Sequence, residues 1–260
     1  MFKRPHPLIT TSGLSKSYGE MIGCHNIDLE LWPGEVLGIV GESGSGKSTL
    51  LGCLSGKLSP TSGKIEYQST EFGLIDIHSV IEPIRRKLMR TEWGVVHQNP
   101  RDGLRLGVTA GANIGERLMS TGLRNYSKIR SKALYWMREV ELETDRIDHF
   151  PREFSGGMQQ RLQIACNLVT SPKLIFMDEP TGGLDVSVQA RLLDLLRDLV
   201  TRLGLSVVIV THDLAVARLL AHRLMVMKKG EVVETGLADQ VLDDPQHPYT
   251  QLLVSSILQA

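Results

Sequence analysis

The chain has 260 residues, 42% of them hydrophobic, and is therefore long enough to bury a sizeable core. Lys plus Arg total 29, as do Asp plus Glu, and this balance argues against nucleic acid or an anionic membrane as a partner. The sequence shows no apolar segment typical of a signal peptide or of a membrane span, so we expect a cytoplasmic protein that does not insert into a membrane. Its three cysteines, Cys24, Cys53 and Cys166, match no metal-site spacing and are expected to be reduced, buried thiols.

The first part of the chain carries strand signals followed by a helix signal. Strands are predicted at residues 27–31 and 36–40, separated by a turn at 32–35, and a helix is predicted to begin near Gly46. The basic segment 84–90, IRRKLMR, is interpreted as the solvated face of a helix, with a partner-binding surface as the alternative.

The second part of the chain alternates between short apolar runs and helical patterns. The runs at 174–177 and 207–210 are each followed by polar residues, which is typical of buried parallel strands. Residues 186–203 place apolar side chains at helical spacing. This alternation predicts an α/β sheet. Residues from about 100 to 164 interrupt the alternation and are predicted to form an inserted helical lobe, and those from about 236 to 260 a C-terminal helical tail, all within one domain spanning 1–260.

A glycine-rich segment, GESGSGKS at 41–48, fits the pattern G-x-x-x-x-G-K-[ST] and lies between a predicted strand and a predicted helix. Small residues let main-chain N–H groups converge on phosphate oxygens, while Lys47 can reach the outer phosphates and the Ser48 hydroxyl can bind Mg²⁺. A simple glycine turn is the alternative, because the bare pattern arises by chance in roughly one chain in a hundred of this length. The predicted phosphate-binding residues are Gly41, Ser43, Gly44, Ser45, Gly46, Lys47, Ser48 and Thr49.

A second motif, LIFMDE at 174–179, is an apolar strand that ends in two acids. Beside a phosphate loop, Asp178 is predicted to hold Mg²⁺ through water, and Glu179 to accept a proton from the attacking water. Two acids after a strand can also cap a helix, but the phosphate loop favours the catalytic interpretation.

The segment 154–165, FSGGMQQRLQIA, lies between these motifs and resembles the signature sequence of ATP-binding cassette proteins. P-loop kinases and GTPases share the phosphate loop but not this segment. Its Ser155, Gly156 and Gly157 suit a helix N-terminus that binds an anion through main-chain N–H groups. In the family that anion is the γ-phosphate held by the opposite subunit, so the resemblance implies a head-to-tail dimer of two cassette chains, identical or different, with ATP and Mg²⁺ between them.

Four further positions match the family, and the resemblance covers nearly the whole chain. Tyr18 resembles the aromatic residue that stacks on adenine, and Gln98 the glutamine that senses Mg²⁺ and water. Asp185 resembles a residue of the dimer contact, and His212 the switch histidine at the γ-phosphate. The implied fold is a P-loop parallel-sheet core with an antiparallel β subdomain and a helical signature subdomain. The chain departs from common family residues at Met158, Gly182, Gly183 and Cys166.

The family resemblance also assigns roles. The implied catalytic residues are Glu179, His212, Gln98 and Lys47, and the implied Mg²⁺ residues are Ser48, Gln98 and Asp178.

Within the family, the chain resembles a group that includes ATPases of peptide and nickel importers and the cassette subunit of the bacterial carbon-phosphorus lyase system. Segments 90–105, 113–119 and 181–197 favour the lyase subunit. The implied partner is then a soluble enzyme complex that breaks the carbon-phosphorus bond of phosphonates. The bond chemistry would belong to another subunit, because no Fe-S cysteine cluster is present in this sequence. The predicted docking surface is segment 99–105 together with Arg85, Arg86 and Arg90.

Three alternatives remain. The ATPase could drive a peptide, nickel or phosphonate importer, it could act on nucleic acid, or it could be a stand-alone phosphotransferase. The balanced charge argues against nucleic acid, and a small kinase would not need the dimer surface that the signature segment supplies.

Overall fold

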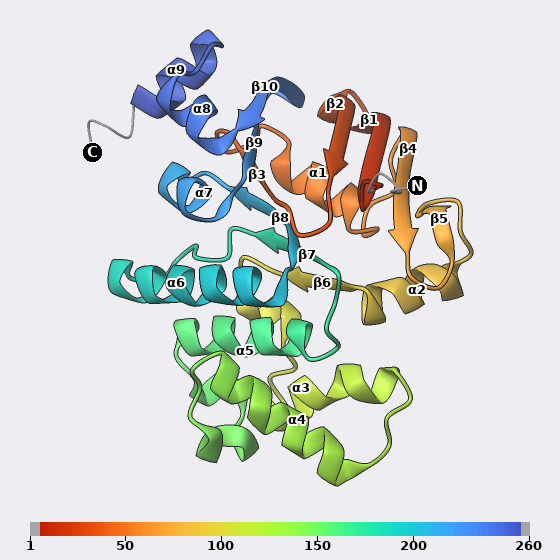
Figure 1. Ribbon diagram of the computed structural model, residues 1–260, viewed down its shortest axis with the longest axis vertical. Helices are drawn as coiled ribbons and strands as arrows, with labels where there is room; N and C mark the ends of the chain where they lie inside the picture. Colours follow the sequence, from red (N-terminus) through yellow and green to blue (C-terminus); the bar gives the residue numbers. More distant parts are fainter. Residues whose placement is uncertain (1–5, 256–260) are drawn as a thin grey trace, which may run out of the picture.

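A six-stranded sheet forms the centre of the computed structural model, which describes residues 6–255 (Figure 1). Its strands, in the order in which they lie side by side, are β10 (Glu231–Leu237), β9 (Arg223–Lys228), β3 (Val36–Val40), β8 (Ser206–Thr211), β7 (Leu174–Asp178) and β6 (Trp93–Val96). All neighbours are parallel except β9 and β10. The inner strands β3, β7 and β8 are buried along almost their whole length, which explains their unbroken apolar sequences.

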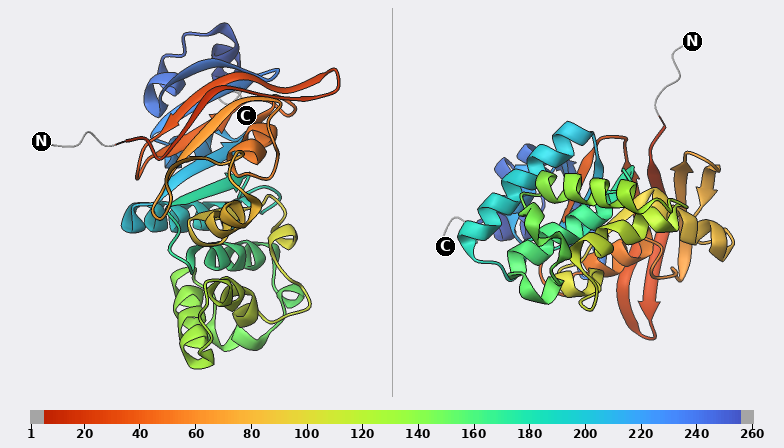
Figure 2. Two further views of the ribbon diagram at one scale, coloured as in Figure 1. Left: turned by 90° about the vertical axis from the view of Figure 1, so that its right-hand side faces the viewer. Right: turned by 90° about the horizontal axis from the view of Figure 1, so that it is seen from below.

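A second, antiparallel sheet lies at the opposite end of the molecule from the helical lobe (Figure 2). Its strands, in spatial order, are β2 (Met21–Leu31), β1 (Ile9–Tyr18), β4 (Ser62–Ser69) and β5 (Gly73–Asp76). The strand predicted at 27–31 therefore begins six residues too late, because β2 starts at Met21, which pairs with Tyr18 of β1. Register shifts along this hairpin and the positive φ of Asn26 (49°) disturb the alternation by which a strand is normally recognised.

Helix α1 (Lys47–Leu54) is packed between the two sheets. Its buried face meets one side of the parallel sheet, including Phe176 and Val208, together with the inner face of the antiparallel sheet. The other side of the parallel sheet, including Ile175 and Ile209, packs against a separate core made with helices. Neighbouring residues of one strand thus face two different cores, as the two-residue period of a strand requires.

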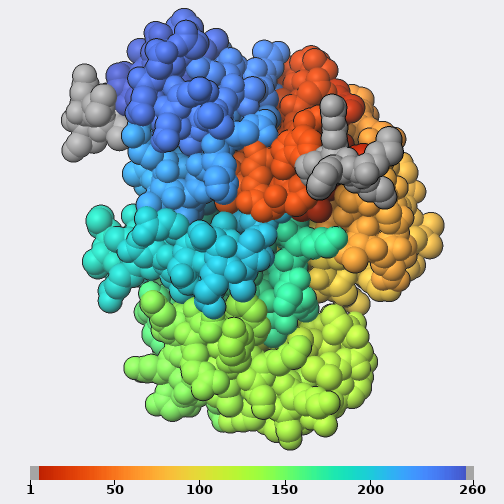
Figure 3. All heavy atoms as spheres, in the orientation of Figure 1, coloured from red at the N-terminus to blue at the C-terminus, as the bar shows by residue number. Residues whose placement is uncertain are grey.

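A helical lobe fills the other end of the molecule, where it forms the yellow-green block of Figure 3. Its main helices are α3 (Ala110–Ser120), α4 (Tyr126–Glu139) and α5 (Gly156–Leu168), with short 3-10 helices at Pro100–Gly103, Thr144–Asp148 and Pro151–Glu153. Helix α5 continues past the predicted limit of 164 to Leu168, because Cys166 and Leu168 are buried with the rest of its face.

The basic segment lies on α2 (Glu82–Thr91), immediately before β6. Leu88 faces the core while the Arg86 side chain is 61% exposed, so this helix has the solvated face that its sequence favours. Arg85 and Arg86 both pair with Glu82.

The remaining helices follow β7 in the chain. They are α6 (Val186–Leu203), α7 (Leu214–Leu220), α8 (Ala238–Asp243) and α9 (Pro248–Ser255). The bounds of α6 coincide with the predicted helix. The helical tail begins later than predicted, at Ala238, because Leu237 still pairs with Arg223 in β10 and β9; residues 256–260 of the predicted tail lie outside the described residues. Within residues 6–255, no helix is both long enough and apolar enough to cross a membrane.

All three cysteines are free and buried, as predicted. Cys166 is enclosed in the core between the lobe and the parallel sheet, and its burial raises the pKa of the thiol to about 12. It therefore acts as a small apolar residue of α5.

Candidate ATP-binding site

The loop at 41–46 connects the buried end of β3 to the first turn of α1 and is shaped by glycines. Gly41 has φ 150°, and a Cβ there would lie 2.2 Å from the carbonyl oxygen of Met227. Gly46 has φ 101°, and a Cβ there would lie 2.1 Å from the carbonyl oxygen of Gly23. Only glycine fits both positions, so the loop can pass close to β9 and β2. Its tight path brings main-chain N–H groups to the start of a helix, where an anion is favoured.

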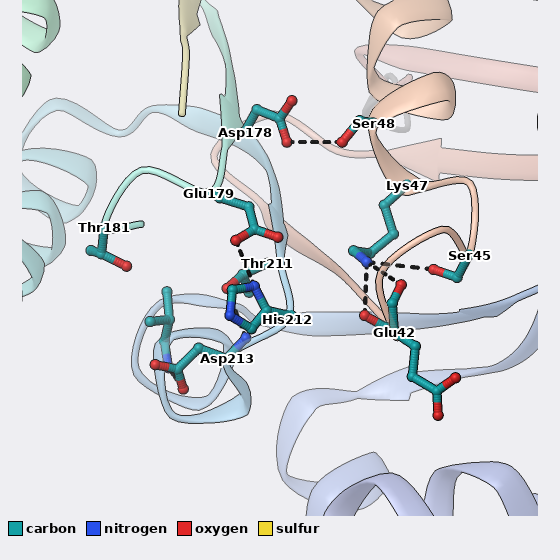
Figure 4. Close-up of polar contacts among 12 residues, drawn as sticks. Glu42, Ser45, Lys47, Ser48, Asp178, Glu179, Thr181, Thr211, His212 and Asp213 are labelled. Carbon is teal, nitrogen blue, oxygen red and sulfur yellow. Dashed lines mark hydrogen bonds and ion pairs between the residues drawn. The ribbon is translucent and has the colours of Figure 1, made fainter. Parts of the chain in front are cut away.

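Lys47 is enclosed by this loop, with only 5% of the residue exposed. Its Nζ donates hydrogen bonds of 2.7 Å to the main-chain carbonyls of Gly41 and of Glu42 (Figure 4). Burial lowers the pKa of Lys47, while the nearby carboxylates of Glu179 and Asp178 act in the opposite direction. A phosphate oxygen entering the loop would meet an ammonium group that is already oriented, which limits the entropy lost on binding.

Ser48 and Asp178 bring oxygen atoms together from α1 and from the end of β7. The Ser48 hydroxyl donates to Asp178 Oδ1 at 3.2 Å (Figure 4). Burial raises the pKa of Asp178, and the hydrogen bond from Ser48 opposes that shift. A hydroxyl, a carboxylate and the nearby Gln98 amide are oxygen donors of the kind that Mg²⁺ takes beside a phosphate, so this set fits a magnesium ion.

Glu179 is held in an unusual conformation directly after β7. Its φ is 43°, and its N–H donates to the Val210 carbonyl on the neighbouring strand at 2.9 Å. The Glu179 carboxylate lies 2.5 Å from His212 Nδ1, and only 16% of the carboxylate side chain is exposed, against 65% for the imidazole (Figure 4). A positive φ in a non-glycine residue costs free energy and is typical of functional sites. The arrangement turns the carboxylate toward the histidine that follows β8, a pairing suited to a base and the group that orients it.

These groups border a cavity of about 360 Å³ at the end of the parallel sheet. The cavity is lined by Tyr18, Met21, Ile22, Gly23, Ser43, Gly44, Gly46, Lys47, Ser48, Thr49, Gln98 and Glu179. The structure therefore brings together, in one hollow, nine residues that were predicted to bind or process ATP. Four other predicted residues, Gly41, Ser45, Asp178 and His212, do not line the cavity but contact Lys47, Ser48 or Glu179, which do.

Sequence reasoning missed Met21, Ile22 and Gly23, which line the cavity next to Tyr18. Met21 and Ile22 are 65% and 55% exposed, which is high for apolar residues. A Cβ at Gly23 would lie 2.7 Å from Thr49 Cγ2, so the absence of a side chain there lets the hairpin approach α1. The only sequence signal was an apolar pair directly after the Tyr18 turn.

The remaining predicted residues gather at a different place in the described chain, and none of them lines this cavity. Ser155 caps α5, and its Oγ accepts a hydrogen bond from the Met158 N–H at 3.3 Å. A Cβ at Gly157 would lie 2.5 Å from Val188 Cγ1, so α5 begins tightly against the first turn of α6, whose N-cap is Asp185. The structure thus places Ser155, Gly156, Gly157 and Asp185 together, apart from the phosphate loop of the same chain.

Known proteins share this combination of fold and site. The sequence profile described as "ABC transporter" matches residues 24–182. A protein of Escherichia coli (strain K12), "Putative phosphonates utilization ATP-binding protein PhnK", is 64% identical over 253 residues, which are 97% of this chain and 98% of that protein. The "Dipeptide transport ATP-binding protein DppF" of the same organism is 40% identical over 230 residues, 88% of this chain and 67% of that protein.

A solved structure of an ATP-binding cassette is also similar to this chain in fold. The "ATP-binding cassette MJ0796 bound to ADP and Pi", solved as a dimer in a post-hydrolysis state, has a TM-score of 0.79 and 32% identity, covering 88% of this chain and 98% of that one. By sequence, fold and the composition of its nucleotide cavity, the chain belongs to the ABC transporter family and is an ATP-binding cassette ATPase.

Proposed function

We propose that this chain hydrolyses ATP in a head-to-tail pair with a second cassette, and that the pair drives conformational change in a cytoplasmic carbon-phosphorus lyase complex during phosphonate breakdown. The observation that carries the pairing is the separation of two half-sites in one chain. The cavity is lined by the phosphate loop and Glu179, whereas the N-terminus of α5 does not line it. MJ0796, a structural relative, is dimeric in its solved structures, which supports the same assembly here.

In this arrangement each residue has a defined task. Tyr18 stacks on adenine, Lys47 and the loop N–H groups bind the phosphates, and Ser155, Gly156, Gly157 and Asp185 act across the interface on the ATP of the second chain. Glu179 accepts a proton from the attacking water, and His212 orients that carboxylate through their 2.5 Å contact.

Magnesium would be held by Ser48 directly, by Asp178 through water and by Gln98. When bound, it neutralises charge on the outer phosphates. Ser48 and Asp178 are already 3.2 Å apart, and Gln98 lines the same cavity.

The proposed partner rests on the relative from Escherichia coli, which matches almost end to end and whose name refers to phosphonate utilisation. In this proposal the cassette would supply motion, and the bond chemistry would belong to another subunit of the complex. The proposed docking surface is segment 99–105 with Arg85, Arg86 and Arg90. Arg90 and Arg86 line one hollow with Ser120 and Thr121 of the lobe, where α2 and α3 meet.

An importer ATPase is the second candidate. It is favoured by the 40% identity with a dipeptide transport protein. The two candidates share all the ATP chemistry and differ only in what docks on the cassette.

Affinity purification separates them. The tagged Glu179→Gln chain would be isolated with ATP from its own host grown on a phosphonate, since this variant should hold the closed state. Lys47→Ala provides the matched control, because it should not reach that state. Recovery of soluble lyase subunits with Glu179→Gln, reduced with Lys47→Ala, is the expected result. Recovery of a polytopic membrane protein instead would reject the lyase partner and favour the importer.

A further inference from the structure

The outer edge of β6 is covered by side-chain amides of α5 instead of by another strand. β6 is the last strand of the parallel sheet, so its outward N–H and C=O groups have no strand partner. The Val95 N–H donates to Asn167 Oδ1 at 2.9 Å, and Asn167 Nδ2 donates to the Val95 carbonyl at 3.0 Å. One amide thus satisfies both main-chain groups of Val95, as a neighbouring strand would.

The same pattern is repeated two residues later, at His97. Its N–H donates to Gln163 Oε1, and its carbonyl accepts from Gln160 Nε2 at 3.2 Å. Gln160, Gln163 and Asn167 lie three and four residues apart on α5 and therefore share one face of the helix. The last main-chain residue bound by these amides, His97, directly precedes Gln98.

Gln163 also supports the far end of the segment that carries Gln98. A Cβ at Gly103 would lie 2.9 Å from both Cγ and Cδ of Gln163, so the last residue of the 3-10 helix Pro100–Gly103 rests on this side chain. Gln163 has no exposed surface. Both ends of the segment 97–103 consequently contact one buried amide.

The His97 side chain is held from the other direction. Lys57, in the loop after α1, places its Nζ 3.1 Å from His97 Nε2. The main chain of His97 is thus bound by the helical lobe, and its imidazole is bound by the core. Any movement of α5 relative to the core must act on this residue.

The contact at His97 is less completely satisfied than the one at Val95. Gln160 Oε1 and Gln163 Nε2 are both buried without a hydrogen-bond partner in the described residues, whereas both amide atoms of Asn167 are bonded. Buried polar atoms without partners are uncommon and costly. Each of the two glutamines therefore binds His97 with one amide atom, while its other amide atom has no hydrogen-bond partner in the described residues.

From these contacts we propose that Gln163 and Gln160 are positioning residues, which set the place of Gln98 through the main chain of His97. They link Gln98 to α5, the helix whose N-cap is Ser155. The inference rests on the proposed role of Gln98 at the metal and γ-phosphate. Movement of α5 when its N-terminus meets the second chain would then change the approach of Gln98 to the metal.

The test measures ATP turnover of the purified full-length chain against Mn²⁺ or Mg²⁺ concentration. Gln163→Met removes the amide while keeping the side-chain length, and Gln160→Met removes the second bond. Asn167→Leu is the matched control, since it removes from Val95 another buried amide of the same helix. The glutamine variants are expected to raise the half-saturating metal concentration about tenfold. The control should lower the melting temperature without moving the metal dependence.

Gln98→Ala separates this inference from the function on which it depends. In that background, Gln163→Met should lower stability but should not shift the metal dependence any further. If Gln98→Ala alone left the metal dependence unchanged, the role of Gln98 would be wrong and the inference would fall with it. If Gln98→Ala shifted it while both glutamine variants behaved like Asn167→Leu, only the positioning role would be rejected. Should Gln163→Met fail to fold, Gln160→Met decides the question alone.

Discussion

The chain uses a glycine-rich helix N-terminus twice, at α1 and at α5, and the two differ in how complete they are. The N-cap of α1 is Gly46, which offers no side-chain cap, so the N-terminus of this helix is open to the cavity that Gly46, Lys47, Ser48 and Thr49 line. Helix α5 is capped by its own Ser155 hydroxyl. The uncapped end, at α1, belongs to a predicted phosphate site whose lining residues come from the same chain. The capped end lies outside that cavity and has one of its N–H groups bonded by its own hydroxyl, which fits the proposal that it meets a phosphate on a second molecule.

The largest expected effect on ATP turnover concerns the cavity beside α1, where Glu179 lies. Glu179→Gln removes the proposed base while keeping the shape of the side chain, so turnover should fall by about 10²- to 10⁴-fold. ATP affinity should be retained, and a closed dimer should accumulate in light scattering with ATP. Unchanged steady-state turnover would show that Glu179 is not the base.

The next largest expected effect on ATP turnover concerns the capped N-terminus of α5. Ser155→Glu places a negative charge where a γ-phosphate is expected, and turnover should fall by about 10²-fold, similar to the loss of an oxyanion donor. Binding of ATP to the single chain should be unaffected. Mixing this variant with Lys47→Ala should restore part of the turnover, because a mixed pair contains one intact site. No recovery on mixing would contradict the division of the site between two chains.

Lys47→Ala tests the uncapped end directly. The ammonium meets the phosphates in both the ground state and the transition state, so its loss should weaken ATP binding by about 1.5 to 3 kcal/mol. Isothermal titration of ATP measures this change, and Ser155→Glu serves as the control with intact affinity. Equal affinities in the two variants would remove the distinction between the two ends.

Tyr18→Ala should have the smallest effect. Stacking on a base contributes about 1 to 3 kcal/mol, and we expect the lower end because Tyr18 is 42% exposed. The variant should bind ATP about fivefold more weakly, as this free energy implies, with the turnover of the saturated enzyme retained. Tyr18→Phe is the matched control, and a similar loss in that variant would argue against stacking.

The position of the site along the chain was readable because its core is local. Residues 41–48 and 174–179 carry the loop, the lysine and the two acids on short segments whose conformation depends on their own glycines and apolar residues. In the same way, the period of 186–203 predicted α6 with its bounds, because helical spacing repeats within a few residues.

The features that the sequence did not predict depend on packing between segments that are distant in the chain. Met21, Ile22 and Gly23 join the cavity only because the β1-β2 hairpin is placed against α1, and Gln163 reaches His97 only because α5 lies along the free edge of β6. Neither contact leaves a periodic or motif signal near the residues concerned. The sequence by itself was enough to predict which chemical groups would bind ATP, since the requirements of a phosphate loop are local. Tertiary structure alone decided that Ser155 lies outside the cavity of the phosphate loop and that the glutamines of α5 bind His97, because both depend on how the lobe and the core pack together.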